Sequence, residues 1–428
     1  MHKIHYLDNR MPVALYPMGE AKTVSIGFFI PAGTIHEAGY PSGISHVIEH
    51  MLFKGTQHYS AYDIAIAMDH IGGELNAYTS KECTGILARV LPEDLAVPIN
   101  LVEEMLFRSR FEKEDLIKEK AVILEEILSY EDSPEDISYD GLSKVIYKGS
   151  PLVHPILGTR ESLEKIDEKV LRDYFNRFYD PGAMVISVAG KIDAGRVLAL
   201  LNSTFGTNKV RRRHYLPAVK RVPFQGGKFL KTRNFEQTHL DIALWGPEEE
   251  HRLYYAASIL NNILGGTISS RLFQRIREEK GLVYSIHSQI NAYESAGSLM
   301  ISYSLNKSQV EKATHLILKE LVRLRDQGIT PEEFHHSKKH LVGNMLLETE
   351  TPEDFMSLMA KDLLYRRPVP SVEKILSRIE ATRFEEVGQV VDLLFSHPVA
   401  FGAVGQIVPS EFEALYEKLS NTLEEKHV

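Results

Sequence analysis

Four short motifs from the first half of this 428-residue chain recur in the second half, in the same order and at a nearly constant offset. They are FKGT at 53–56 (LGGT at 264–267), NAY at 76–78 (again at 291–293), SPED at 133–136 (TPED at 351–354) and VAGKI at 188–192 (AVGQI at 403–407). Self-similarity of this kind indicates a structural repeat. The length suits two or three domains, each large enough for its own core. We therefore predict two copies of one domain.

Hydrophobic patterning predicts that each copy combines strands and helices. In the first half we expect strands at 23–30, 74–79, 84–90 and 184–192, and helices at 62–70, 92–108, 111–130 and 193–205. Strands that stand before, between and after helices predict an α+β fold, in which a mainly antiparallel sheet has helices packed on one face.

The predicted N-terminal domain spans 1–205 and the C-terminal domain spans 229–428. Residues 206–228 are basic and contain paired Gly and several Pro residues, so we interpret them as a linker. Within this linker, the triplet Arg211–Arg213 is expected to be solvated rather than to form a binding patch.

Composition narrows the class of protein. The formal net charge is −9, which argues against nucleic acid as a partner. The single cysteine, Cys83, excludes an internal disulfide and fits a reducing compartment; we expect it to be a small core residue. Neither a secretory signal nor an apolar run of membrane-spanning length is recognisable. The sequence thus predicts a cytoplasmic protein that does not enter a membrane.

The segment 43–56 contains the strongest chemical pattern. His46, Glu49 and His50 form an H-x-x-E-H motif, and at helical pitch these side chains lie on one face. Two imidazoles four residues apart can bind one divalent ion, and the carboxylate between them can reach a water on that ion. Ser42 is the expected N-cap of this helix.

A histidine pair at this spacing can also be an ordinary solvated helix face, because the chain has 18 His. The repeat separates the two interpretations. The corresponding residues of the second copy are Ala257, Leu260 and Asn261, so the imidazoles and the carboxylate are absent there. Residues needed for packing would tend to occur in both copies. Their presence in one copy favours a chemical role.

A zinc site needs a further, distant ligand, and the predicted helix 111–130 offers Glu125 and Glu126. Glu126 lies two turns after Glu119 on the same face, whereas Glu125 points about a quarter-turn away. Helix geometry favours Glu126 and leaves Glu125 as the alternative. The second copy has Asn344 opposite Glu126, which repeats the asymmetry seen at the histidines.

The motif HVIEH, followed by the final Glu of VILEE, resembles the pitrilysin-type (M16) zinc metallopeptidases, an inverzincin family. The resemblance implies one Zn²⁺ per chain, bound by His46, His50 and Glu126. It implies that Glu49 activates the zinc-bound water and that Glu119 orients a histidine. It extends over nearly the whole chain.

The resemblance also implies residues that contact the substrate. Arg277 and Tyr284 match a family pair that reaches the substrate from the C-terminal domain and stabilises the reacting carbonyl. An extended substrate would add as a further strand beside 74–79. The residues assigned to this binding are Asn76, Ala77, Thr79 and, with a role left open, Glu82.

Taken together, these features predict a zinc endopeptidase that cleaves peptides or unfolded segments. The family works with four such domains around a closed chamber, so a two-domain chain with a complete residue set is expected to form a homodimer. A bacterial cytoplasmic enzyme is the expected setting. The alternatives are a subunit that needs a paralogous partner and a noncatalytic assembly subunit of the same fold.

Overall fold

The computed structural model describes residues 2–210 and 220–424. The triplet Arg211–Arg213 of the predicted linker lies outside the described residues. The chain divides into two units. The first unit comprises Met1–Ile127, His154–Ala218 and Leu346–Lys374, and the second comprises Leu128–Val153, Val219–Met345 and Ile375–Val428. The domain boundaries expected at 205 and 229 stay a prediction.

The first unit is built on a six-stranded sheet in the order β1-β2-β6-β3-β5-β4. Its strands are β1 (Lys3–Tyr6), β2 (Pro12–Pro17), β3 (Val24–Ile30), β4 (Glu74–Thr79), β5 (Thr84–Val90) and β6 (Val185–Gly190). β2 and β6 run parallel, and the other neighbouring strands run antiparallel. All seven residues of β3 are buried, as expected for a central strand covered on both faces. β4 stands at the sheet edge and pairs with β5.

Helices from the first half of the chain cover one face of this sheet. They are α1 (Ile44–Leu52), α2 (Ala61–His70), α3 (Ala96–Phe107), α4 (Lys113–Glu131), α6 (Arg160–Glu164), α7 (Glu168–Phe178) and α8 (Ala194–Thr204). Their apolar residues form one core with the strands, centred on fully buried side chains such as Ile26, Ile48 and Ile123. This core holds α1 and α4, the two helices on which the metal ligands are predicted.

The second unit repeats the architecture of the first. Its five-stranded sheet has the order β7-β11-β8-β10-β9, which matches β2-β6-β3-β5-β4, and the pair β7–β11 is again parallel. The strands are β7 (Gly227–Thr232), β8 (Thr238–Trp245), β9 (Ser285–Ala292), β10 (Gly297–Leu305) and β11 (Ala400–Gly405). The predicted α+β fold in two tandem copies is confirmed.

Most helices of the second half belong to this unit. They are α9 (Tyr254–Asn261), α10 (Val310–Gln327), α11 (Pro331–Leu347), α13 (Val372–Ala381), α14 (Phe384–Phe395) and α15 (Pro409–Glu424). In the repeat, α9 occupies the position of α1.

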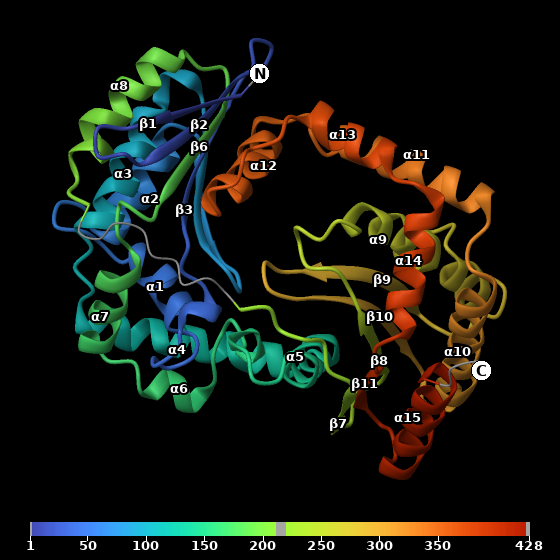
Figure 1. Cartoon of the computed structure of the whole chain (residues 1–428). Coiled ribbons are helices and arrows are strands. Elements are labelled where there is room, and N and C mark those ends of the chain that lie inside the picture. Colours follow the sequence, from blue (N-terminus) through green and yellow to red (C-terminus); the bar gives the residue numbers. More distant parts are fainter. Residues whose placement is uncertain (1, 211–219, 425–428) are drawn as a thin grey trace. The chain divides into compact units, whose positions relative to one another are not determined.

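The two copies exchange one helix each, which sequence patterning did not predict (Figure 1). α12 (Pro352–Leu364) packs on the second face of the first sheet, where the Ser187 hydroxyl donates to the Met356 carbonyl at 2.7 Å. α5 (Pro134–Ile146), its counterpart in the repeat, packs on β7, β8 and β11 of the second sheet. Each sheet is thereby covered on its second face by a helix from the other half of the sequence.

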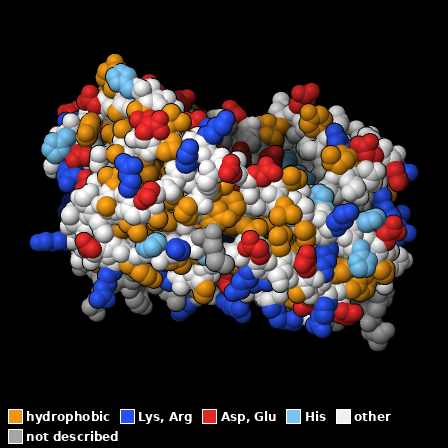
Figure 2. Space-filling model, turned by 90° about the horizontal axis from the view of Figure 1, so that it is seen from above, with side chains coloured by type: hydrophobic (Ala, Val, Ile, Leu, Met, Phe, Trp, Pro, Cys, Tyr) orange, Lys and Arg blue, Asp and Glu red, His pale blue; other side chains and the backbone are white. Residues whose placement is uncertain are grey.

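Charged side chains of both signs lie on the described surface (Figure 2). In Figure 2, acidic and basic side chains are interspersed over the face shown, with small hydrophobic areas between them. None of the described helices is long and apolar enough to cross a membrane.

Candidate metal centre

The N-terminus of α1 is held by a buried carboxylate from outside the helix. Gly43 occupies the N-cap with φ of 88°, a left-handed conformation that favours glycine, and no side chain caps the helix from this position. Glu37 instead accepts hydrogen bonds from the backbone N–H groups of Gly43 (2.8 Å) and Ser45 (3.0 Å). The prediction of Ser42 as the N-cap is therefore wrong by one residue. Burial raises the pKa of Glu37 to about 7, against the opposing effect of these hydrogen bonds.

Two helices bring His46, His50 and Glu126 together. His46 Nε2 lies 3.6 Å from one Glu126 carboxylate oxygen, and His50 Nε2 lies 3.7 Å from the other. One ligand atom from each residue lies within 4.8 Å of the other two. Ligand atoms about 2.1 Å from a tetrahedral zinc would stand roughly 3.4 Å apart, so these separations suit a shared ion. Glu125 is exposed and is not part of this cluster.

The chemistry of the donors also suits a divalent metal. Burial, followed by the neighbouring His50, lowers the pKa of His46 to about 4, so this imidazole is neutral near pH 7 and its lone pair is available. A neutral imidazole is the form that binds metal. Two imidazoles and one carboxylate match a zinc site that uses three protein ligands.

Glu119 lies beside the three candidate ligands and fixes the orientation of His50. Its buried carboxylate accepts from His50 Nδ1 at 3.1 Å, which directs Nε2 of the ring toward the cluster. The other carboxylate oxygen of Glu119 pairs with Lys54 Nζ at 2.8 Å. A chain of three side chains thus runs from Lys54 through Glu119 to His50.

Glu49 stands beside the cluster without belonging to it. Its side chain is half-buried, and the hydroxyl of Thr79 donates to its Oε2 at 2.5 Å. Burial raises the pKa of Glu49, while the Thr79 hydrogen bond and the charge of His50 lower it and the charge of Glu126 raises it. A carboxylate with a raised pKa beside a metal-binding site is suited to accept and return a proton.

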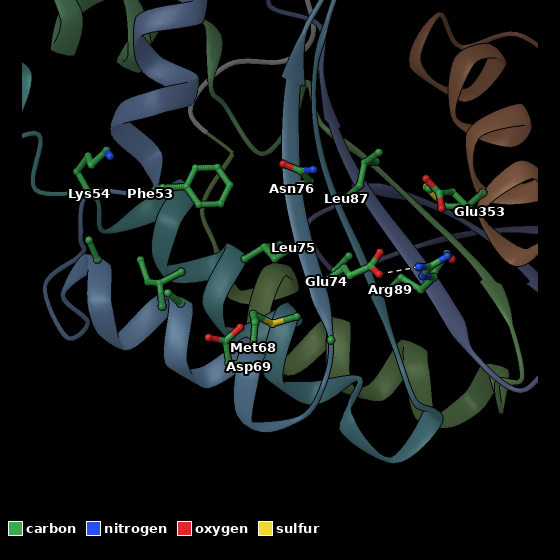
Figure 3. A pocket seen from close by; sticks show the side chains of 17 residues that line it. Phe53, Lys54, Met68, Asp69, Glu74, Leu75, Asn76, Leu87, Arg89 and Glu353 are labelled. Atoms are coloured by element: carbon green, nitrogen blue, oxygen red, sulfur yellow. Dashed lines mark hydrogen bonds and ion pairs between the residues drawn. The ribbon is translucent and has the colours of Figure 1, made fainter. Parts of the chain in front are cut away.

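The edge strand β4 carries the residues predicted to bind substrate. A pocket of about 670 Å³ follows this strand and has a different lining on each side (Figure 3). Phe53, Met68 and Leu75 lie on the side of the helices, whereas Glu74 and Arg89, joined by an ion pair, lie on the other. Asn76 is exposed and Ala77 and Thr79 are half-buried, in the alternation of a strand. Glu82 follows in the turn between β4 and β5.

Arg277 and Tyr284 belong to the second unit. Arg277 lies in a π-helical turn, Phe273–Glu278, with its guanidinium 4.7 Å from the centre of the Phe273 ring. Tyr284 has 74% of its surface exposed, which is uncommon for a large aromatic side chain. Their assignment to the substrate stays a prediction.

Three contributions were missed by sequence reasoning. They are the helix-capping carboxylate of Glu37, the cation of Lys54 and the hydrogen bond from Thr79 to Glu49. Glu37 precedes the helix by several residues, so no capping spacing reveals it. Lys54 lies four residues after His50, and this spacing is the one signal that points to it.

Comparison with known proteins adds independent information. The family model described as insulinase (peptidase family M16) matches residues 13–160, and the model described as peptidase M16 inactive domain matches residues 165–341. The uncharacterized zinc protease YmxG of Bacillus subtilis is 36% identical over 404 residues, which cover 94% of this chain and 98% of that protein.

Solved structures agree on the fold. A peptidase M16 inactive domain from Pseudomonas fluorescens aligns with a TM-score of 0.87 at 19% identity, over 95% of this chain and 98% of that chain. A protease from Helicobacter pylori aligns with a TM-score of 0.88 at 19% identity, over 94% and 99% respectively. At this identity the likeness concerns the fold alone. The family models and the B. subtilis relative go further, and they show that the chain belongs to peptidase family M16.

Proposed function

We propose that this chain is a zinc-dependent endopeptidase that cleaves peptides or unfolded segments. The observation that carries the proposal is the convergence of His46 and His50 on α1 with Glu126 on α4, beside the carboxylate of Glu49. The name of the B. subtilis relative, a zinc protease, supports the choice of metal.

In this proposal the Nε2 atoms of His46 and His50 and a carboxylate oxygen of Glu126 hold one Zn²⁺. When bound, zinc supplies a Lewis acid that lowers the pKa of water and polarises a carbonyl group. Three protein ligands, rather than four, are typical of catalytic zinc sites. Glu119 keeps the proton of His50 on Nδ1, so that the Nε2 lone pair faces the ligand cluster.

Glu49 is the proposed general base. The Thr79 hydroxyl donates a hydrogen bond to its Oε2, which leaves Oε1 without a hydrogen-bond partner among the described residues. Glu49 takes a proton at Oε1 from the attacking water and then delivers it to the nitrogen of the leaving amine. Arg277 and Tyr284 would donate hydrogen bonds to the oxyanion that develops on the scissile carbonyl.

The substrate would bind as an extended strand along the unpaired edge of β4, beside Asn76, Ala77 and Thr79. Glu82 would contact the substrate at the end of this strand. Because side chains alternate along a strand, successive substrate residues would meet the apolar lining near Leu75 and the charged lining near Glu74. Two chains would form a homodimer around a closed chamber, in the bacterial cytoplasm.

The decisive experiment compares Glu49→Gln with wild type in a peptide-cleavage assay. The variant keeps every metal ligand, so it is expected to bind zinc normally and to lose at least ~10²-fold in kcat. Glu126→Gln should lose zinc as well as activity. The matched control is Glu125→Gln, because Glu125 is the exposed neighbour outside the cluster. Undiminished cleavage by Glu49→Gln would contradict the mechanism.

The second candidate is a noncatalytic or partner-dependent subunit. The description of the model that matches residues 165–341, an inactive domain, is the observation that favours it. Zinc content and peptide cleavage by the isolated chain separate these candidates from the proposed enzyme, since a noncatalytic subunit would cleave no peptide on its own. A chain that cleaves only after a paralogue is added would be a heterodimer subunit.

A further inference from the structure

The contact between Thr79 and Glu49 links two parts of the molecule that sequence reasoning treats separately. Thr79 is the last residue of β4, the strand expected to pair with substrate. Glu49 lies on α1, and α1 packs against β4. Within the described residues, the Glu49 carboxylate accepts its one hydrogen bond from the Thr79 hydroxyl, at 2.5 Å.

The direction of the Thr79 side chain follows from the pleat of β4. Successive side chains of a strand point to opposite faces. Leu75, Ala77 and Thr79 are the half-buried set of β4, and Glu74, Asn76 and Tyr78 are the exposed set. Thr79 therefore faces the helical layer that contains Glu49. Its β-branched side chain has restricted rotation about χ1, which fixes the direction of the hydroxyl.

Resting on the proposed function, we infer that Thr79 is a positioning residue: its hydroxyl holds Glu49 Oε2 so that Oε1 faces the attacking water. This role differs from a substrate contact. A hydroxyl that binds substrate affects KM, whereas a hydroxyl that orients the base affects kcat. The geometry of the base thus depends on the strand to which the substrate would be added.

The test compares Thr79→Val with Thr79→Ser in the zinc-loaded chain, on one peptide substrate. Val keeps the branched shape and removes the hydroxyl, whereas Ser keeps the hydroxyl. Hydrogen bonds to charged groups are strong enough that Thr79→Val should lower kcat by roughly 10- to 100-fold, with little change in KM. Thr79→Ser should recover most of that loss. Zinc affinity should be the same in both variants, because Thr79 contacts none of the three ligands.

Thr84→Val is the matched control. Thr84 is the cross-strand partner of Thr79 on β5, but its hydroxyl donates to the Ala32 carbonyl at 2.7 Å. This variant should be less stable without the selective loss of kcat.

A readout that needs no turnover completes the experiment. Thr79→Val and Glu49→Ala, singly and together, form a double-mutant cycle in thermal unfolding midpoints. If the two side chains interact, the unfolding midpoint of the double variant should fall by less than the sum of the two single decreases. Fully additive decreases would contradict the hydrogen bond.

The inference is overturned if the wild type is active and Thr79→Ser is as slow as Thr79→Val, or if Thr79→Val acts through KM alone. A wild-type chain that binds zinc and cleaves no peptide would overturn the proposed function itself. The two failures are therefore distinguishable.

Discussion

The candidate metal ligand His50 is oriented through a residue outside the proposed ligand set. Lys54 Nζ pairs with Glu119, and Glu119 in turn accepts from His50 Nδ1. A buried carboxylate without a cation is costly, because its charge has lost the solvation of water. Lys54 therefore holds one oxygen of Glu119 in place, and the other oxygen is left to accept the hydrogen bond from His50 Nδ1.

Replacing Lys54 with Met should weaken zinc binding by roughly tenfold, as expected for groups that orient a metal ligand. Competition titration with a chromophoric chelator measures this affinity without any substrate. Lys118→Met is the control, because Lys118 on α4 is 72% exposed in its side chain and pairs with Asp115 instead. Equal zinc affinity in Lys54→Met and Lys118→Met would contradict the role of Lys54.

Glu37 should make the stability of the metal-free chain depend on pH. Burial raises its folded-state pKa to about 7, above the ordinary 4.5, so folding favours the protonated acid. Its contribution to the free energy of unfolding is complete below pH 4.5 and is lost as the pH rises through 7, by about 3 kcal/mol. Glu37→Gln cannot ionise and should lack this loss.

Urea unfolding of both proteins from pH 4.5 to 8, with chelator present, measures the effect. The informative quantity is the difference in unfolding free energy between wild type and Glu37→Gln, because the titration of other groups, such as His36, cancels in it. A difference that stays constant across this range would show that Glu37 does not titrate there.

Local spacing explains which site residues could be predicted from the sequence. His46, Glu49 and His50 share a helix face, and Glu119 and Glu126 lie two turns apart on another, so helical periodicity relates the members of each set. The contact between the two helices is tertiary. It followed from the family resemblance, and the structure brings these residues within metal-binding distance. Periodicity gave no indication of the contact between Thr79 and Glu49, and the position of Lys54 four residues after His50 was the one signal for the contact of Lys54 with this site.

The exchanged helix α5 depends on a close approach to the second sheet. Gly141 on α5 lies against Phe229 of β7, and a Cβ added at Gly141 would stand 2.1 Å from the Phe229 ring. A helix can approach a strand this closely only where the side chain is absent. The glycine therefore belongs to the packing of α5 on the second sheet.

Gly141→Ala should destabilise the chain by about 1–3 kcal/mol, because the added methyl group overpacks the contact with Phe229. Gly388→Ala on α14 is the matched control. A Cβ at Gly388 meets nothing within 4 Å, and there the gain in helix propensity should stabilise by about 0.5–1 kcal/mol. Denaturant unfolding compares the two. Equal effects would contradict the packing of α5 described for the second unit.

The positions of strands were predicted better than the sheet on which each helix packs. The predicted strands 74–79 and 84–90 coincide with β4 and β5, because turn residues bound two short segments, of which β4 alternates and β5 is mostly buried. The predicted helix 111–130 is α4, displaced by one or two residues. The exchange of α5 and α12 was not predicted, since the apolar stripe of a helix shows that it packs, but not on which of two similar sheets.

The two copies keep the same topology but differ at the residues of the candidate metal centre. α1 and α9 occupy corresponding places, yet His46, Glu49 and His50 of α1 are replaced by Ala257, Leu260 and Asn261 on α9. In the second copy, α9 therefore carries none of the three residues, and we expect this copy to have a different role. In the proposed enzyme it would supply Arg277 and Tyr284 and complete the chamber.

The proposed chamber makes a prediction about size and substrate together. Sedimentation should give twice the chain mass of 48.5 kDa, because the proposed chamber needs four domains and each chain supplies two. A closed chamber admits extended chains, so the zinc-loaded protein should cleave a reduced, unfolded protein much faster than the same protein in its native state. A chelator should stop both reactions. If native and unfolded forms are cleaved at equal rates, or if a monomer has the full activity, substrate selection does not depend on a dimeric chamber.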